Sequence, residues 1–148
     1  MRALAYAKVN LSLHVGTAGG ERHPVSGLFQ SIGWADRLTL ELADEAVIAG
    51  PGGGPVVAGE GNLAWRAAVG VRGLSSAGRA MALTLEKEIP VAAGLGGGSA
   101  DAAAALALAG RLWGVDPDTV LEAAGIEPTA RAEELAPGDY LRLAEAVA

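Results

Sequence analysis

Residues 90–101 read Pro90-Val91-Ala92-Ala93-Gly94-Leu95-Gly96-Gly97-Gly98-Ser99-Ala100-Asp101, and they are the most informative stretch of the chain. They lie between a predicted strand, Ala80–Glu86, and a predicted helix from about Ser99 to Trp113. Successive glycines let the backbone take positive φ angles and come close to a ligand. Their N–H groups, together with the N-terminus of the following helix, predict a phosphate-binding site with the Ser99 hydroxyl at its mouth.

Two other nucleotide-binding loops do not fit this stretch. It has no Gly-Lys-Ser/Thr ending, so it is not a Walker loop, and residues 94–98 do not match the dinucleotide spacing G-x-G-x-x-G. The alternative is a purely structural turn capped by Ser99. A structural turn seldom needs four glycines in five residues followed at once by a helix, so we favour the phosphate site.

The segment Ala7–Val15 alternates apolar and polar residues, which predicts a half-buried strand. Lys8 and Asn10 share its polar face, and the residues expected to face the core are Val9, Leu11, Leu13 and Val15. Further strands are predicted at Leu28–Ile32 and Arg37–Leu42, the second with Leu38, Leu40 and Leu42 on one face.

Helices are predicted mainly in the second half of the chain. A glycine- and proline-rich loop, Gly50–Pro55, precedes a helix from about Leu63 to Leu74 with Asn62 as its N-cap. Asp116-Pro117 begins another helix, which Gly125 ends, and Pro137 begins a last short one. Because strands come first and helices later without strict alternation, the pattern favours an α+β fold over a doubly wound parallel sheet.

Composition fits one domain of 148 residues with a core built from Ala, Leu and Val, since 51% of the residues are hydrophobic and only 4% are aromatic. The net charge of −6 argues against nucleic acid as the main partner. Cysteine is absent, which excludes a thiolate metal site, and no other metal-ligand spacing stands out. Neither a signal peptide nor a membrane span is recognisable, so we expect a cytoplasmic protein without a membrane partner.

The glycine-rich stretch resembles the second motif of the GHMP kinases, in which it wraps the triphosphate of ATP. By this resemblance the ATP contacts are Pro90, Gly94, Leu95, Gly96, Gly97, Gly98 and Ser99. The resemblance also implies that Ser99 approaches Mg²⁺. Asp101 fits the same motif, and we expect it to face ATP or solvent.

Other segments resemble one branch of this superfamily, the kinases of 4-diphosphocytidyl-2-C-methyl-D-erythritol. Residues 7–13, Ala-Lys-Val-Asn-Leu-Ser-Leu, look like the first motif, which implies that Lys8 is catalytic and neutralises charge near the reacting hydroxyl, and that Asn10 binds the substrate. Asn62 and Lys87 match positions on the adenine side of ATP; helix capping and a solvated charge are their respective alternatives. His23 matches the histidine that contacts cytosine, although the preceding Asp-Gly-Tyr of the family is replaced by Gly20-Glu21-Arg22.

The resemblance implies a two-layer α+β fold like the second domain of ribosomal protein S5, and ATP- and Mg²⁺-dependent phosphorylation of that small-molecule substrate in non-mevalonate isoprenoid precursor biosynthesis. It runs from about Ala5 to about Ala124, with an interruption at Gly50–Pro55, and we expect residues 1–124 to form an incomplete ATP-binding domain. Residues 125–148 lack the family's catalytic Asp and resemble the C-terminus of the ribosomal-RNA adenine dimethyltransferases. The chain alone is therefore expected to be inactive. The alternatives are another GHMP small-molecule kinase and a non-catalytic nucleotide-binding module.

Overall fold

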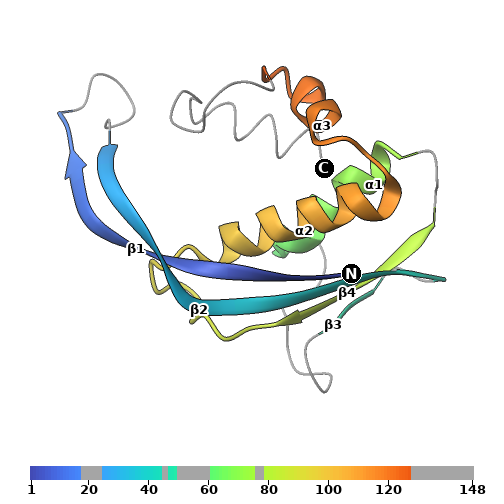
Figure 1. The fold of residues 1–148 in the computed structure, drawn as a ribbon, viewed down its shortest axis with the longest axis horizontal. Coiled ribbons are helices and arrows are strands. Elements are labelled where there is room, and N and C mark those ends of the chain that lie inside the picture. The colour runs from blue at the N-terminus through green and yellow to red at the C-terminus, as the bar shows by residue number, and fades with distance from the viewer. Residues whose placement is uncertain (18–24, 45–46, 50–60, 76–78, 128–148) are drawn as a thin grey trace.

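The computed structural model describes residues 1–17, 25–44, 47–49, 61–75 and 79–127. In chain order their elements are β1 (Arg2–Val15), β2 (Val25–Ala43), β3 (Val47–Ala49), α1 (Leu63–Gly73), β4 (Ala80–Glu86), α2 (Gly97–Trp113) and α3 (Pro117–Ala123). The strands form one sheet in the order β1-β2-β4-β3, and the helices lie on one side of it (Figure 1). This arrangement confirms the predicted α+β class.

The sheet is mostly antiparallel. β2 pairs antiparallel with both β1 and β4, and the short β3 adds to β4 in parallel. The prediction of two separate strands at Leu28–Ile32 and Arg37–Leu42 is wrong, because both belong to the single strand β2. Tyr6 pairs with Ala35 and Lys8 pairs with Ser31. Between these two pairs β2 has two more residues than β1, which produces a bulge-like irregularity in β2.

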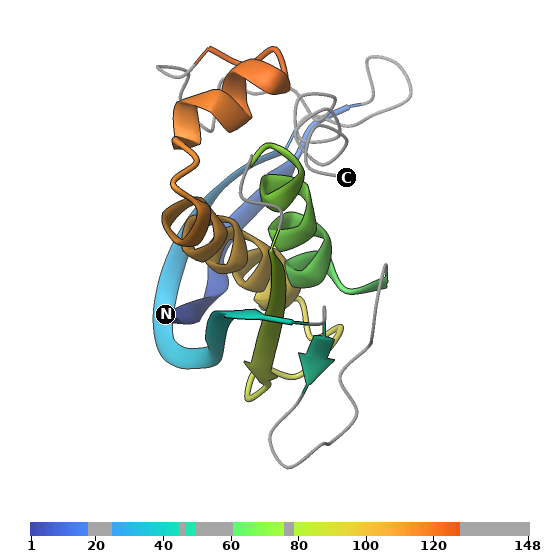
Figure 2. The ribbon, with the colours of Figure 1, turned by 90° about the vertical axis from the view of Figure 1, so that its right-hand side faces the viewer.

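The core lies between the sheet and the helices α1 and α2, which pack against each other (Figure 2). In β4 the predicted alternation is confirmed, since Met81, Leu83 and Leu85 are buried and their neighbours are not. Small residues on both helices let them approach the sheet and each other closely. The other buried members of this core cluster are Ala5, Leu38, Leu40, Ala64, Ala67, Ala68, Val71, Ala105, Leu108, Ala109, Trp113 and Val120.

The outer half of β1 does not face the core as its alternation predicted. Leu11, Leu13 and Val15 are 60%, 50% and 61% exposed, whereas Ala5 and Ala7 near the start of the strand are buried. The reason is length: β1 and β2 run together well past the ends of α1 and α2 (Figure 1). The alternation identified a strand correctly, but it did not show which part of the strand the helices cover.

The helix boundaries follow the predicted caps closely. The Asn62 side chain accepts a hydrogen bond from Trp65 N at 3.1 Å at the start of α1. Asp116 caps α3 ahead of Pro117, and Gly125 follows that helix with a φ of 66°. α2 begins at Gly97, two residues before its predicted start. The predicted loop Gly50–Pro55 and the helix predicted from Pro137 lie outside the described residues.

Candidate functional site

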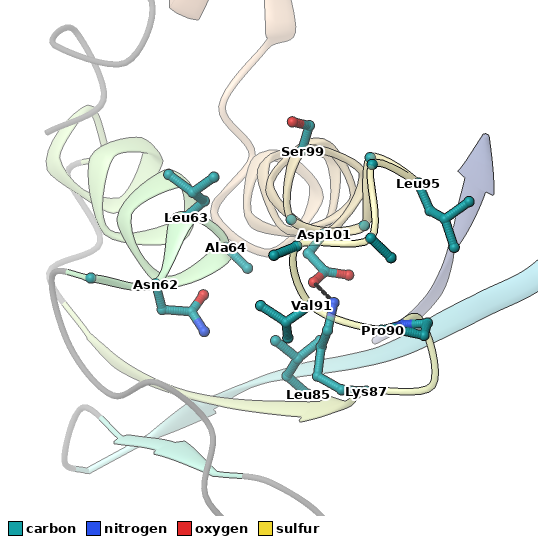
Figure 3. A pocket seen from close by; sticks show the side chains of 17 residues that line it. Asn62, Leu63, Ala64, Leu85, Lys87, Pro90, Val91, Leu95, Ser99 and Asp101 are labelled. Atoms are coloured by element: carbon teal, nitrogen blue, oxygen red, sulfur yellow. Dashed lines mark hydrogen bonds and ion pairs between the residues drawn. The ribbon is translucent and has the colours of Figure 1, made fainter. Parts of the chain in front are cut away.

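A cavity of about 400 Å³ opens beside the glycine-rich stretch (Figure 3). Its walls are residues 61–64 at the start of α1, Leu85 and Lys87 at the end of β4, the loop 90–96 and the first turns of α2. The fold thus brings together segments that are far apart in the sequence. All of the residues predicted to contact ATP line this cavity: Asn62, Lys87, Pro90, Gly94, Leu95, Gly96, Gly97, Gly98 and Ser99.

The loop takes the unusual backbone conformations that its glycines predicted. Gly94 and Gly96 have φ angles of 75° and 73°. Ala92 has a φ of 60°, which places a side-chain-bearing residue in the left-handed region at a cost of about 1–2 kcal/mol. Strain of this kind is typically concentrated at ligand-binding sites.

The start of α2 has no side chain to cap its amide groups. Gly96 is the N-cap residue, and it makes no side-chain cap hydrogen bond. The first amide groups of a helix have no partner within the helix, and the helix dipole gives this end a partial positive charge. Both features suit the binding of a phosphate at the wall of the cavity where α2 begins.

Lys8 joins β1 to the glycine loop through both its backbone and its side chain. Its backbone N–H donates to Leu95 O at 2.9 Å, and its ammonium donates to Gly94 O at 2.9 Å and to Asn10 Oδ1 at 2.9 Å. The ammonium also lies 5.7 Å from the centre of the Phe29 ring. Lys8 and Asn10, which the sequence placed on one strand face, are therefore held together at the loop.

Gly96 leaves room for this lysine. A β carbon built on Gly96 would lie 3.2 Å from both Cγ and Cε of Lys8, closer than most such contacts in proteins. A side chain at position 96 would therefore push against the lysine stem as well as strain the backbone. The Lys8 ammonium consequently sits at the edge of the predicted phosphate site.

Beneath the start of α2, one ammonium and two carboxylates form a mostly buried cluster. Lys87 Nζ donates to Asp36 Oδ2 and, at 2.7 Å, to Asp101 Oδ2. Asp36 Oδ1 accepts from the backbone N–H groups of Glu88 at 2.6 Å and Ile89 at 2.8 Å. The cluster therefore ties β2, the segment after β4 and α2 together at the floor of the cavity.

The two carboxylates differ in their affinity for protons. Burial favours the neutral form of Asp36, but hydrogen bonds from Lys87, Ile89 and Glu88 outweigh it and hold the pKa of Asp36 below its ordinary value. Burial raises the pKa of Asp101 to about 6, and Lys87 only partly offsets it. For Lys87, burial opposes the charged form, yet its bonds to Asp101 and Asp36 raise its pKa.

The expectation that Asp101 faces ATP or solvent is corrected as to solvent, whereas Asp101 does line the cavity. Asp101 is only 3% exposed, and Figure 3 shows its carboxylate directed at Lys87. The alternative of a solvated charge is wrong for Lys87, because its ammonium is paired with two carboxylates. A contact of Lys87 with ATP stays a prediction. The Ser99 side chain points away from this cluster (Figure 3).

Sequence reasoning missed Asp36, although a signal for it was present. Asp36 is fully buried, and it precedes Leu38 and Leu40 on the same face of β2. An acidic residue in phase with core leucines requires a buried partner, because an unpaired charge in a core is very costly. The position of Asp36 on the same strand face as the core leucines therefore predicts a cation nearby, and Lys87 is that cation.

The remaining predicted site residue, His23, lies outside the described residues. Across the described ranges, no group of three or more His, Cys, Asp or Glu side chains is placed to hold a metal ion. None of the helices in these ranges combines the length and apolar character of a membrane span.

Comparison with known proteins gives consistent matches. The 4-diphosphocytidyl-2-C-methyl-D-erythritol kinase of Hyphomonas neptunium is 43% identical over 125 residues, which are 81% of this chain and 42% of that protein. The enzyme of the same name from Moorella thermoacetica is 47% identical over 91 residues, which are 61% of this chain and 32% of that protein. The chain therefore spans less than half the length of these relatives.

A solved structure and a family match agree with these relatives. The crystal structure of a 4-(cytidine 5'-diphospho)-2C-methyl-D-erythritol kinase superimposes with a TM-score of 0.68 at 37% identity, covering 81% of this chain and 43% of that one. Residues 62–140, more than half of the 148, match the GHMP kinases N terminal domain. The chain therefore belongs to the GHMP kinase family and carries its N-terminal domain.

Proposed function

We propose that this chain binds ATP in the cavity beside the glycine loop and provides the phosphate-binding part of a kinase. One observation carries this proposal: the uncapped start of α2 lines the cavity, and the Lys8 ammonium, although Lys8 itself does not line it, binds the adjoining loop at Gly94 O, 2.9 Å away. Amide groups at a helix start and a lysine at the same loop suit a polyphosphate. The adenine end of ATP would lie near Asn62 and Lys87.

The proposed reaction is phosphorylation of 4-diphosphocytidyl-2-C-methyl-D-erythritol in non-mevalonate isoprenoid precursor synthesis. The substrate and the pathway are taken from the relatives. In this reaction Lys8 would neutralise charge on the transferred phosphoryl group, Asn10 would hydrogen-bond the substrate, and His23 would contact its cytosine. Since ATP is the proposed co-substrate, we also propose a cytoplasmic location.

We propose that Mg²⁺ binds at this site together with the nucleotide, through its phosphates. Lys87 already pairs with one oxygen of each carboxylate of the floor, and we assign neither carboxylate as a ligand of the cation. Ser99 offers a hydroxyl at the start of α2. Mg²⁺ commonly binds through substrate phosphates with few protein ligands, and we propose that Ser99 is one of them.

Among the described residues that line the cavity, the acidic side chain is Asp101, which is only 3% exposed and is bound through Oδ2 to Lys87. We do not assign it as the base that accepts the proton of the substrate hydroxyl. We therefore propose that residues 1–124 act as a nucleotide-binding domain and that phosphoryl transfer needs a base from elsewhere. Residues 125–148 remain a separate segment in this proposal.

Nucleotide binding is tested by calorimetry with ADP and ATP. The variant Gly98→Leu should abolish binding, because its side chain starts 3.7 Å from Leu63 Cδ1 and fills the cavity between α1 and α2. Gly73→Leu is the matched control: it adds the same group at the far end of α1, where a β carbon meets nothing within 4 Å. Equal affinity in wild type and Gly98→Leu would place the nucleotide elsewhere.

Phosphoryl transfer is tested with the cytidyl substrate by measuring substrate-dependent ADP release. We expect nucleotide binding without transfer from the 148-residue chain. Transfer that Lys8→Ala abolishes would reveal an unrecognised base, or a site completed by a second copy. Transfer to mevalonate, homoserine or galactose in place of the cytidyl substrate would favour another GHMP kinase.

A further inference from the structure

A second cavity, of about 370 Å³, lies between the second half of α2 and α3, and it shares no lining residue with the cavity beside the glycine loop. α3 lies on the side of α2 that faces away from the sheet (Figure 1). The apolar walls of this α2–α3 groove are the half-buried Leu106 and Val115 and the buried Val120. Its size and apolar walls suit the side chains of a bound segment.

Small residues keep this groove open. Gly114 ends α2 with a φ of 65°, so the chain turns back on the helix. Val115 then donates its N–H to Gly110 O at 2.9 Å, and a β carbon on Gly110 would lie only 3.0 Å from Val115 O. Because Gly110 has no side chain and Ala107 has only a methyl group, the surface of α2 stays hollow beside the turn.

The C-terminal segment Pro137–Ala148, which lies outside the described residues, has a sequence that fits such a groove. Its residues Tyr140, Leu143 and Val147 recur at the i, i+3 and i+7 spacing of one helix face. The sequence therefore predicts a short amphipathic helix that begins at Pro137. One face of that helix is apolar and needs a partner to cover it.

The charges of the groove and of the segment are complementary. Arg111 and Asp116 line the groove and are exposed, so the groove carries one charge of each sign. Neither of them forms an ion pair with another described residue. The segment carries Arg142 and Glu145, three residues apart, on the side of the predicted helix that is away from its apolar face. Each charge at the groove can therefore meet an opposite charge of the segment.

Chain connectivity favours this segment over a second copy of the protein. Residues 128–139 join Glu127, the last described residue, to Tyr140, and when extended they reach up to about 40 Å. The whole of α2 is only about 25 Å long, so the segment can reach the groove. A tether of this length gives the segment an effective concentration on the order of millimolar. A second copy must bind at its much lower free concentration and against the same net charge of −6.

We propose that residues 137–148 bind in the α2–α3 groove of their own chain, with Tyr140, Leu143 and Val147 against its apolar walls. The charged side of the segment then faces the two charged residues that line the groove. This contact braces α3 against α2 and covers apolar surface that the described residues leave open. It requires no nucleotide, so it stands independently of the proposed function.

Hydrogen exchange of the whole 148-residue chain, followed by mass spectrometry, tests this contact. The amides of residues 137–148 should exchange about tenfold or more slower than those of a free peptide of the same sequence. Ala107→Arg, which fills the groove, and Leu143→Gln should each restore the rate of the free peptide. The matched controls are Ala103→Arg, one turn earlier on exposed α2 and outside the groove, and Leu135→Gln, outside the segment. Both controls should keep the protection.

A pair of introduced cysteines identifies the occupant, because the chain has no cysteine of its own. Ala107→Cys combined with Leu143→Cys should form a disulfide within one chain under mild oxidation at micromolar protein. The control pair is Glu41→Cys with Leu143→Cys, since Glu41 is exposed and alternates with the buried Leu40 on β2. It should form that disulfide about tenfold more slowly, because the sheet separates Glu41 from the groove.

Three results would overturn the inference, and they are distinguishable. Wild-type exchange of residues 137–148 at the rate of the free peptide would show that the segment is not bound. Protection that survives Ala107→Arg and Leu143→Gln, or that Ala103→Arg also removes, would place the segment elsewhere. Disulfide-linked dimers that increase with protein concentration, in place of linked monomers, would make a second copy the occupant.

Discussion

Gly97 lies so close to Ile89 that a β carbon added to it would come within 3.0 Å of Ile89 Cγ2, and within 3.4 Å of Asp36 Oδ2. The missing side chain lets α2 begin directly on the buried cluster. Gly97→Val should therefore lower the free energy of unfolding by about 2–3 kcal/mol through overpacking. This glycine is required by the fold before any ligand arrives.

The matched control is Gly98→Ala, one residue along the same helix. Its β carbon meets only Leu63 Cδ1, at 3.7 Å, and alanine favours the helix by up to about 1 kcal/mol over glycine. Urea denaturation of both variants separates the effect of steric overpacking on stability from the effect of helix propensity. Equal stability of the two would show that α2 can shift away from Ile89 at little cost.

Lys8→Ala should lower stability by about 1 kcal/mol, since it removes hydrogen bonds to Gly94 O and Asn10 and the contact with Phe29. The polar strand face alone predicted a change within about 0.5 kcal/mol, as for ordinary surface substitutions. Lys8→Met keeps the stem that packs against Gly96 and should lose less. Thermal denaturation ranks the three proteins, and a fully stable Lys8→Ala would mean that these bonds are not formed in solution.

Asn62 has two separable roles. Asn62→Ala removes the cap of α1 and should cost about 1 kcal/mol of stability. Asn62→Asp keeps an oxygen that accepts from Trp65 N, so stability should stay near that of wild type, while its charge in the cavity weakens nucleotide binding. Stability is followed by denaturation and affinity by calorimetry. Loss of stability in both variants would show that the amide group itself is needed.

The stability of wild type relative to Asp101→Asn should fall as the pH rises from about 4 to about 6. The pKa of Asp101 is raised from 3.8 to about 6, so between these values the folded protein binds more protons at this site than the unfolded chain. Above pH 7 the difference should be constant. Asp36 contributes with the opposite sign, because its pKa is lowered, but it is present in both proteins. Parallel stability curves over pH 4–7 would show that the pKa of Asp101 is not raised.

Much of the local structure was readable from the sequence. Asn62, Asp116 and Gly125 mark helix ends by the chemistry of their own side chains or backbone, and each does so in the structure. The alternation of β4 and the glycine loop before α2 were also predicted, because both depend on neighbours within a few residues. The resemblance added the family, and the comparisons confirm it.

Only the tertiary structure decided which face of each strand or helix packs against another element and which is exposed. β1 alternates along its whole length, but α1 and α2 cover only one end of the sheet, so Ala7 is buried and Leu13 is exposed. Asp101, expected to face ATP or solvent, is buried against Lys87, to which Asp36, 65 residues earlier in the chain, also binds. Periodicity fixes the direction of a side chain relative to its own element. Burial and ion pairing depend on which other element is packed there, and only the folded chain supplies it.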